Sequence, residues 1–329
     1  MTDPAPIYDD PSFIAGARAW ARESVASLGL AVSGPIEQPH VRPWSTVFRV
    51  PTTHGAVYLK CCGPTQAHEP RLSALLQRVR PGLVPDVLAL HPDLPWMLVA
   101  EGGVKMRDAY RGDALLEAWR ALLPRHAELQ RALVPHIAEA GAYGTPDHRA
   151  APLVAAFAAV IADEPALSGG RPDRLTPDER RAAERLVPAL ERACRDLASL
   201  GIEDTVQHDD LHHGNVLVRD GRAVVFDWGD ACVSHPFLVL AVNLRFAADA
   251  TARSRDDPRI LALRDVYLET WADRASPADL VAAAELGRRI GEVSRTITFH
   301  AVARAYEGVL DAYPGGLAGS LRRVLALFA

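Results

Sequence analysis

Three polar side chains that could share a metal ion fall within one short stretch of the chain. Asp210 and Asn215 precede an apolar run, and Asp227 follows a second apolar run. Between the two runs, the pair Asp220–Gly221 indicates a two-residue hairpin turn. In that register Asn215 faces Phe226 and is diagonal to Asp227, and diagonal cross-strand neighbours are roughly 7–8 Å apart. Two carboxylates and an amide at one end of a hairpin suit Mg²⁺, which prefers oxygen ligands and substrate phosphates.

The motif reads H-x-D-x-x-x-x-N, hairpin, D, with His208 two residues before Asp210. Protein-kinase-like phosphotransferases build their catalytic loop in this order. The local wording, HDDLHHGNVL followed by VVFDWGDA, resembles the aminoglycoside phosphotransferase and choline kinase family more than protein kinases. The resemblance implies that Asp210 orients and deprotonates the acceptor hydroxyl and that Asn215 and Asp227 hold Mg²⁺. His208 is expected to brace the loop.

Two positions of the loop depart from the commonest wording of that family. Asp209 stands where glycine is usual, and His213 stands where proline is usual. Neither is a ligand position, so the implied roles are retained, although the local shape of the loop can differ. A purely structural use of the motif is the weaker interpretation, because the histidine, the hairpin and the later aspartate all accompany it.

A second chemical interpretation takes the histidines of the loop as ligands of a transition metal. His208, His212 and His213 lie among aspartates, and imidazole suits zinc or iron. This pattern would describe a metal-dependent hydrolase. The chain has no H-E-x-x-H motif, and Gly214 favours a loop over a helix, so the phosphotransferase interpretation is preferred.

Upstream of the loop, the sequence contains a lysine and a glutamate that could complete a kinase-like site. Extended pieces at 45–50 and 56–60 predict a β-hairpin that ends in Lys60. A helix is expected over 68–79, with Glu69 in its first turn. By analogy with kinases, Lys60 would contact the α- and β-phosphates of a nucleotide, and Glu69 would hold the ammonium group in place.

Other contacts with the nucleotide are expected from the order of the elements. The loop that covers the phosphates should lie near residues 39–46, where Ser45 and Thr46 could offer a hydroxyl or backbone N–H group. No G-x-G-x-x-G occurs there, and this branch of the family tolerates its absence. A later strand leads into a glycine-rich break, which resembles the kinase hinge. Backbone groups near Val99 and Ala100 would there meet an adenine edge.

The remaining pattern predicts an α+β, bilobed protein-kinase-like fold. An N-terminal lobe over 1–104 would cover the nucleotide, and a helical C-terminal lobe over 105–329 would carry the catalytic hairpin and the acceptor pocket. Pro124 and Pro188 should kink or divide their helices. Further strands are expected at 87–90 and 96–99, and helices at 12–29, 113–137, 151–162, 176–200, 237–250, 258–271 and 276–289, with a closing pair through Phe328.

The composition excludes several classes of protein. The net charge of −5 indicates no nucleic-acid partner, and the longest apolar run is too short to span a bilayer. The first ten residues lack the basic and apolar regions of a signal peptide. Four cysteines without C-x-x-C spacing are typical of free thiols in a reducing cytoplasm. We therefore expect a cytoplasmic protein, and the sequence gives no prediction of its oligomeric state.

The sequence thus favours a small-molecule kinase that uses Mg²⁺ and ATP, with GTP as a possible donor. A P-loop kinase is excluded because G-x-x-x-x-G-K-[ST] is absent. A nucleotide-binding pseudo-enzyme or regulatory module on the same fold is the alternative. The resemblance implies acceptors such as aminoglycosides, macrolides, choline, ethanolamine, amino sugars, fructosamines or homoserine. Acidic residues that could receive an ammonium-bearing acceptor are Asp230, Glu285, Glu292 and Glu307.

Overall fold

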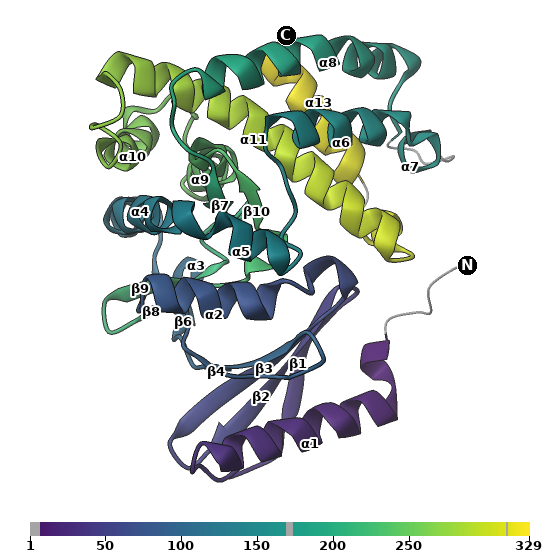
Figure 1. Ribbon diagram of the computed structural model, residues 1–329, viewed down its shortest axis with the longest axis vertical. Helices are drawn as coiled ribbons and strands as arrows, with labels where there is room; N and C mark the ends of the chain where they lie inside the picture. The colour runs from purple at the N-terminus through teal and green to yellow at the C-terminus, as the bar shows by residue number, and fades with distance from the viewer. Residues whose placement is uncertain (1–6, 169–173, 314) are drawn as a thin grey trace.

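The computed structural model describes residues 7–168, 174–313 and 315–329. Strands gather in the N-terminal region and helices in the C-terminal region, which confirms the predicted α+β class (Figure 1). Residues 1–6, on which the prediction of no signal peptide partly rests, lie outside the described residues. Within the described part of the chain, no helix combines the length and the apolar character needed to cross a bilayer.

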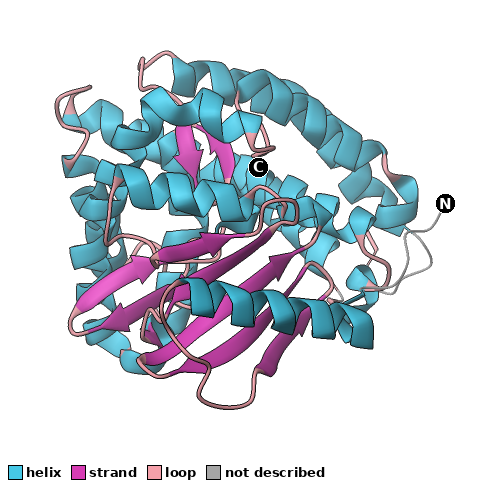
Figure 2. Ribbon diagram, turned by 60° about the horizontal axis from the view of Figure 1, so that its bottom comes forward, coloured by secondary structure: helices cyan, strands magenta, loops and turns pink. Residues whose placement is uncertain are grey.

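The N-terminal region is a five-stranded antiparallel sheet with strand order β1-β2-β3-β5-β4. Helix α1 crosses one face of this sheet, where Ala17 and Ala21 pack with Phe48 and Leu59 (Figure 2). Helix α2 lies between the sheet and the helical region (Figure 1). The elements are η1 (Ile7–Asp9), α1 (Pro11–Ser27), β1 (Glu37–Arg42), β2 (Ser45–Thr52), β3 (Gly55–Cys62), η2 (Pro64–Gln66), α2 (Glu69–Val79), β4 (Val87–Leu90) and β5 (Trp96–Ala100).

The register of β2 and β3 sets the position of Lys60. Thr52 pairs with Gly55, so the hairpin turns through two residues, and Val47 pairs with Lys60 near the other end. Strand β1 was not predicted: most of the expected phosphate loop over 39–46 is in fact strand, because His40 pairs with Val47. Only a two-residue turn separates β1 from β2.

The C-terminal region is built from helices around the catalytic hairpin. Its aromatic core includes Phe237, whose ring lies 5.8 Å from that of Tyr267 and 5.6 Å from that of Trp271. The elements are β6 (Val104–Lys105), α3 (Met106–Ala109), α4 (Gly112–Leu133), η3 (Val134–His136), α5 (Ile137–Ala142), α6 (Ala150–Ala162), α7 (Glu164–Ser168), α8 (Pro177–Ala198), β7 (Thr205–Gln207), β8 (Val216–Arg219), β9 (Arg222–Val225), η4 (Trp228–Asp230), β10 (Cys232–Ser234), η5 (Pro236–Val239), α9 (Leu240–Ala250), α10 (Pro258–Glu269), α11 (Pro277–Ala305), α12 (Val309–Ala312) and α13 (Gly316–Phe328).

Capping residues predicted the helix boundaries better than proline residues did. Thr176 caps α8 in a capping box with Glu179, as its sequence indicates. Pro188 lies inside α8, and Pro124 lies inside α4, yet neither residue divides its helix. The expectation that α11 ends near Arg289 is wrong, because the helix continues to Ala305.

Helix α11 passes very close to η5, and this approach brings its middle turns to the catalytic loop. The approach depends on glycine: a Cβ atom on Gly291 would lie 2.3 Å from the carbonyl oxygen of Leu238. A Cβ atom on Gly287 would lie 2.7 Å from the Cβ atom of Phe237. Any side chain at these two positions would therefore push α11 away from the elements that it packs against.

Candidate active site

The catalytic hairpin has the register that its Asp-Gly turn predicts. Val216 pairs with Val225, and Arg219 pairs with Arg222, on either side of the turn. The backbone N–H of Phe226 donates to the carbonyl oxygen of Asn215, 3.1 Å away, so the ladder extends one pair further. Asn215 and Asp227, which follows Phe226, therefore lie at the same end of the hairpin.

His208 joins the two ends of the catalytic segment. Its side chain is fully buried, its Nε2 lies 2.9 Å from the carbonyl oxygen of Phe226, and its Nδ1 lies 3.3 Å from the backbone nitrogen of Asp210. Burial lowers the pKa of His208, which favours the neutral imidazole. A neutral ring that donates from Nε2 to Phe226 and accepts at Nδ1 from Asp210 satisfies both contacts.

The side chain of Asn215 is held by Asp210. Its Nδ2 donates to the backbone oxygen of Asp210 at 3.0 Å and to the carboxylate oxygen Oδ2 at 3.2 Å. Because both hydrogen bonds use the amide nitrogen, the amide oxygen of Asn215 remains as a ligand atom. Asp227 follows the hairpin in a left-handed conformation, with φ of 66°, and its side chain is 43% exposed.

Lys60 connects the sheet to this end of the hairpin. Its Nζ lies 2.7 Å from the Glu69 carboxylate and 2.5 Å from Oδ1 of Asp227. Burial opposes the charge of Lys60, but the two carboxylates outweigh this effect and raise its pKa. For Asp227, burial likewise opposes the charge, and the ammonium of Lys60 outweighs it and lowers the pKa. Lys60 and Asp227 are therefore both charged at neutral pH.

These donors fit a magnesium ion. Asp227 supplies an ionised, partly exposed carboxylate. Asn215 supplies its amide oxygen, because its amide nitrogen already donates to Asp210. Mg²⁺ is usually bound through one or two protein oxygen ligands together with waters and substrate phosphates. The ammonium of Lys60 balances the charge of Asp227. Lys60, Glu69, Asn215 and Asp227 thus converge from the sheet, α2 and the hairpin.

Asp210 faces helix α11. Its Oδ1 lies 3.4 Å from Nε of Arg295, and its Oδ2 lies 3.5 Å from Nε2 of His212. Burial opposes ionisation of Asp210, but the charge of Arg295 and the hydrogen bond of His212 lower its pKa to about 2. Arg295 also donates to Oδ2 of Asp230 at 2.6 Å. Asp210 is therefore an ionised hydrogen-bond acceptor throughout the neutral range.

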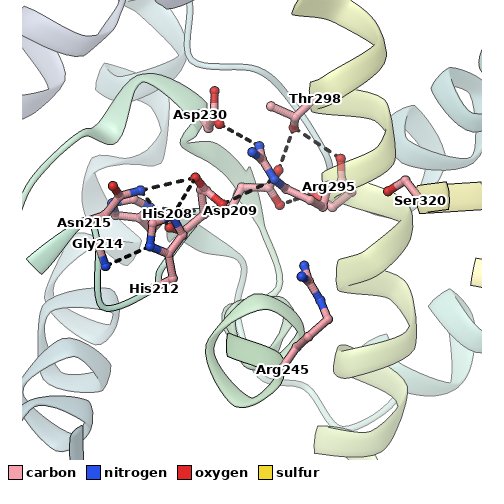
Figure 3. Close-up of polar contacts among 12 residues, drawn as sticks. His208, Asp209, His212, Gly214, Asn215, Asp230, Arg245, Arg295, Thr298 and Ser320 are labelled. Carbon is pink, nitrogen blue, oxygen red and sulfur yellow. Dashed lines mark hydrogen bonds and ion pairs between the residues drawn. The ribbon is translucent and has the colours of Figure 1, made fainter. Parts of the chain in front are cut away.

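Asp209, the residue that replaces the usual glycine, links the loop to α11 (Figure 3). Its φ of 60° explains why glycine suits this position. Asp209 as a whole is only 2% exposed. Its carboxylate accepts hydrogen bonds from the hydroxyls of Ser294 and Thr298, each at 2.6 Å. Gln207 donates a third hydrogen bond at 2.8 Å. Burial raises the pKa of Asp209, and these three donors stabilise its carboxylate.

Replacing Asp209 with asparagine is expected to lower the free energy of unfolding by about 1–3 kcal/mol, because the NH2 group of asparagine cannot accept the hydrogen bond that one of the two carboxylate oxygens receives from a buried hydroxyl. Turnover should fall as well, since Asp210 is the next residue, whereas affinity for Mg–nucleotide should stay the same. Chemical denaturation and steady-state kinetics measure both effects. In a cycle with Thr298→Val, the two losses should be less than additive. Additive losses would contradict a direct coupling between Asp209 and α11.

The four residues that the sequence analysis placed beside the nucleotide, Ser45, Thr46, Val99 and Ala100, are partly occupied by contacts within the sheet. Ser45 and Thr46 are buried at the start of β2, and the hydroxyl of Thr46 donates to the carbonyl oxygen of His40 and accepts from Gln38. That hydroxyl therefore has its partners inside the sheet, against the expectation that it could contact phosphate. Val99 and Ala100 do end strand β5, but the N–H of Ala100 donates to the carbonyl oxygen of Asp86.

The histidines of the loop do not converge on a metal. Both ring nitrogens of His208 contact backbone groups, and Nδ1 of His212 accepts from the N–H of Gly214. Among the described residues, the group of histidine, cysteine and acidic side chains that is compact enough for a metal lies elsewhere: His148, Asp209 and Cys232. The hydroxyl of Ser294 contacts all three, so hydrogen bonds already join this group. The hydrolase interpretation has no support.

Several residues of the site could not be found from the sequence. Arg295, Ser294 and Thr298 come from α11, more than 80 residues after Asp209 and Asp210. The one available signal was the aspartate at position 209, which departs from the usual glycine.

Comparisons with known proteins agree with this geometry. A sequence model described as the phosphotransferase enzyme family, APH, matches residues 39–280. No curated protein matches the chain. Among solved structures, the chain is similar to a choline/ethanolamine kinase family protein from Mesorhizobium loti, with 15% identity, TM-score 0.57 and 94% of each chain covered.

Two antibiotic-modifying enzymes are similar in fold as well. For a macrolide 2'-phosphotransferase from Brachybacterium faecium, the identity is 19% and the TM-score 0.56, with 92% of this chain and 97% of that chain covered. For a spectinomycin phosphotransferase in complex with ADP and spectinomycin, the values are 10% and 0.52, with 94% and 97% covered. The family match spans well over half of the sequence and includes the whole catalytic hairpin, so the chain belongs to the phosphotransferase enzyme family.

Proposed function

We propose that this phosphotransferase moves the γ-phosphoryl group of ATP to a hydroxyl group of a small molecule. The observation that carries the proposal is the convergence of Lys60, Glu69 and Asp227, with Asn215 and Asp210 beside them. These residue types in this arrangement can hold a phosphate tail, a divalent cation and an acceptor hydroxyl. The ADP complex of the spectinomycin phosphotransferase supports a nucleotide as the donor.

Asp210 is the proposed catalytic residue. Its carboxylate would accept a hydrogen bond from the acceptor hydroxyl, orient the oxygen for in-line attack and take the proton as the new bond forms. With a pKa of about 2, Asp210 is a weak base, so its main contribution would be orientation. His208 would fix the backbone on either side by contacting Asp210 and Phe226.

Asn215 and Asp227 would hold Mg²⁺ through the amide oxygen and the carboxylate. Bound there, the ion would neutralise charge on the β- and γ-phosphates. Lys60 would exchange its contact with Asp227 for the α- and β-phosphates and keep its contact with Glu69, whose side chain is fully buried. Loss of the contact between Lys60 and Asp227 would then accompany the binding of Mg–nucleotide.

The division of labour between the two parts of the chain is also a proposal. Residues 1–104 would cover the nucleotide, and residues 105–329 would bind the metal and the acceptor. Since the N–H of Ala100 is engaged, the adenine edge would meet the next backbone groups, at Glu101 and Gly102. Ser45 would contact phosphate only through its backbone, because it is the first residue of β2 and its side chain is buried in the sheet.

Thermal unfolding with nucleotides tests the proposal. ATP or ADP should raise the midpoint of unfolding only when Mg²⁺ is present, and a concentration of 100 times the Kd corresponds to about 2.7 kcal/mol of stabilisation. GTP in the same scan tests whether the site accepts guanine. The Lys60→Met variant should lose most of the shift, because it lacks the cation for the phosphates. If the wild-type protein shows no Mg-dependent shift with any nucleotide, the proposed function is wrong.

A further inference from the structure

Three of the four acidic side chains that could have received an ammonium group, all except the exposed Glu307, are already paired with arginine. Asp230 accepts from Arg295 at 2.6 Å. Glu292 accepts from Arg245 at 2.7 Å and lies 3.4 Å from Nε of Arg323. The same holds two turns earlier on α11, where Glu285 lies 2.9 Å from Arg288. These carboxylates are therefore not available to neutralise the amines of a polycationic acceptor.

Arginine is in excess around Glu292. The side chain of this glutamate is 2% exposed, and it is the single carboxylate that pairs with both Arg245 and Arg323. Burial lowers the pKa of Arg323, and the charges of Arg245 and Arg255 lower it further, although Glu292 opposes them. Two guanidinium groups thus share one buried carboxylate.

This excess of positive charge lies next to Asp210. On α11, Glu292 is one turn before Arg295, whose Nε is 3.4 Å from Asp210. On the other side, the ring of His212, which contacts Asp210, lies 4.6 Å from the ring of Phe246. The guanidinium group of Arg245 lies 4.8 Å from the same phenyl ring.

Arg245 points from α9 toward the region where the side chain of Arg295 reaches from α11 to the catalytic loop (Figure 3). Arg245 donates to Glu292 through Nε, and Arg295 uses Nε and Nη1. In the described parts of the chain, the terminal nitrogens of Arg245 and Nη2 of Arg295 make no hydrogen bond. They remain as donors for a ligand.

We propose that the acceptor carries an oxyanion group, a carboxylate or a phosphate ester, close to the hydroxyl that is phosphorylated. Arg245, Arg295 and Arg323, here called the arginine cluster, would bind this group. Guanidinium groups recognise carboxylates and phosphates through paired hydrogen bonds. A polycationic acceptor would meet like charges there, and the carboxylates of Asp230 and Glu292 are already neutralised by arginine. This inference rests on the proposed function, since it takes Asp210 as the residue that orients the acceptor.

The first test measures anion binding without knowledge of the acceptor. The protein is saturated with Mg²⁺ and AMP-PNP, so that the γ-phosphate position is filled. Inorganic phosphate and D-glycerate are then titrated separately, with thermal unfolding as the readout. At least one of them should stabilise the wild-type protein, and the Arg245→Gln/Arg323→Gln variant should bind it about tenfold or more weakly. The stronger of the two anions indicates whether a phosphate or a carboxylate is preferred.

Two further variants control this titration. Arg264→Gln removes an arginine of similar exposure that pairs with Asp265 on α10, and it should bind the anion like the wild-type protein. Adding Glu292→Gln to the double variant removes the buried charge left behind by the arginines, which protects the fold. This triple variant should also fail to bind. An absent anion effect, or equal binding by the double variant, would overturn the oxyanion subsite.

The second test compares acceptors on one carbon skeleton. D-Glucuronate, D-glucose 6-phosphate, D-glucose and D-glucosamine differ mainly in charge, and release of ADP reports phosphoryl transfer. Among those that react, the anionic sugars should have the highest kcat/KM, and Arg245→Glu should favour D-glucosamine. Higher kcat/KM for D-glucosamine, choline or kanamycin in the wild-type protein would contradict the proposal. If none reacts, the anion titration decides. Failure of the proposed function would show separately, as no Mg-dependent binding of AMP-PNP.

Discussion

Turnover of the Asp210→Asn variant is expected to fall by about 10²–10⁴-fold, whereas its affinity for Mg–nucleotide stays nearly unchanged. The physical reason is that asparagine keeps the size of the side chain but loses the carboxylate that orients the hydroxyl and accepts its proton. Asn215 would still find the backbone oxygen of Asp210, which accepts one of its two hydrogen bonds. The metal ligands should therefore keep their places.

Steady-state release of ADP, with acceptor where one is known and with water otherwise, measures this effect. Asp265→Asn is a suitable control, because Asp265 is an exposed carboxylate on α10 that pairs with Arg264. That variant should react like the wild-type protein. An Asp210→Asn variant with more than about half of the wild-type rate would show that Asp210 is not the residue that orients the acceptor.

The second large effect is expected for Asp227→Asn, which should lose both turnover and binding. Asp227 would be the one charged metal ligand of the site, and its carboxylate also balances the ammonium of Lys60, 2.5 Å away. Turnover should fall by about 10³-fold or more, because loss of the metal removes several kcal/mol of charge stabilisation. Lys60 keeps its contact with Glu69, so the protein should remain folded.

Asp220→Asn provides a matched control on the same hairpin. Asp220 has a φ of 50° in the turn, and its side chain is 92% exposed. Asparagine tolerates this conformation as well as aspartate does, so the control should keep full activity. The rates of ADP release by the two variants are compared at saturating Mg–ATP. Equal rates would mean that the carboxylate at position 227 is not needed.

Local signals in the sequence predicted the hairpin correctly. The Asp220–Gly221 turn fixes the register, and the register alone places Asn215 beside Phe226. The pairing of Lys60 with Glu69 was also predicted, although only nine residues separate them. The short connection is sufficient because β3 ends at Cys62 and α2 begins directly at Glu69. Turns and helix caps depend on residues that are neighbours in the sequence, so they can be predicted from a single sequence.

Contacts between distant segments were not predictable in the same way. The carboxylate of Asp209 depends on Ser294 and Thr298, and no local pattern indicates which turn of α11 meets the loop. The length of α11 was underestimated: the helix continues past Arg289 to Ala305, and Gly287 and Gly291 pack closely against η5, a contact that no local pattern indicates. Strand β1 was missed for a similar reason, since its pairing with β2 defines it better than its own composition.

The charge state of the proposed acceptor region was likewise not predictable from the sequence. Asp230 and Glu292 were candidates for an ammonium group when only the sequence was considered. Their partners Arg295 and Arg245 are 65 and 47 residues away along the chain, so their neutralisation becomes visible only in the folded protein. These two ion pairs leave neither carboxylate free to receive an ammonium group.

The central claim is that Asp227 and Asn215 hold a metal–nucleotide complex while Asp210 serves the acceptor. Calorimetric titration of AMP-PNP into the wild-type protein, Asp210→Asn and Asp227→Asn, each with and without Mg²⁺, tests this most directly. We expect equal Mg-dependent affinities for the wild-type protein and Asp210→Asn. For Asp227→Asn, the affinity should fall about tenfold or more and no longer depend on Mg²⁺. Equal loss of affinity in both variants, or no dependence on Mg²⁺ in the wild-type protein, would contradict this division of roles.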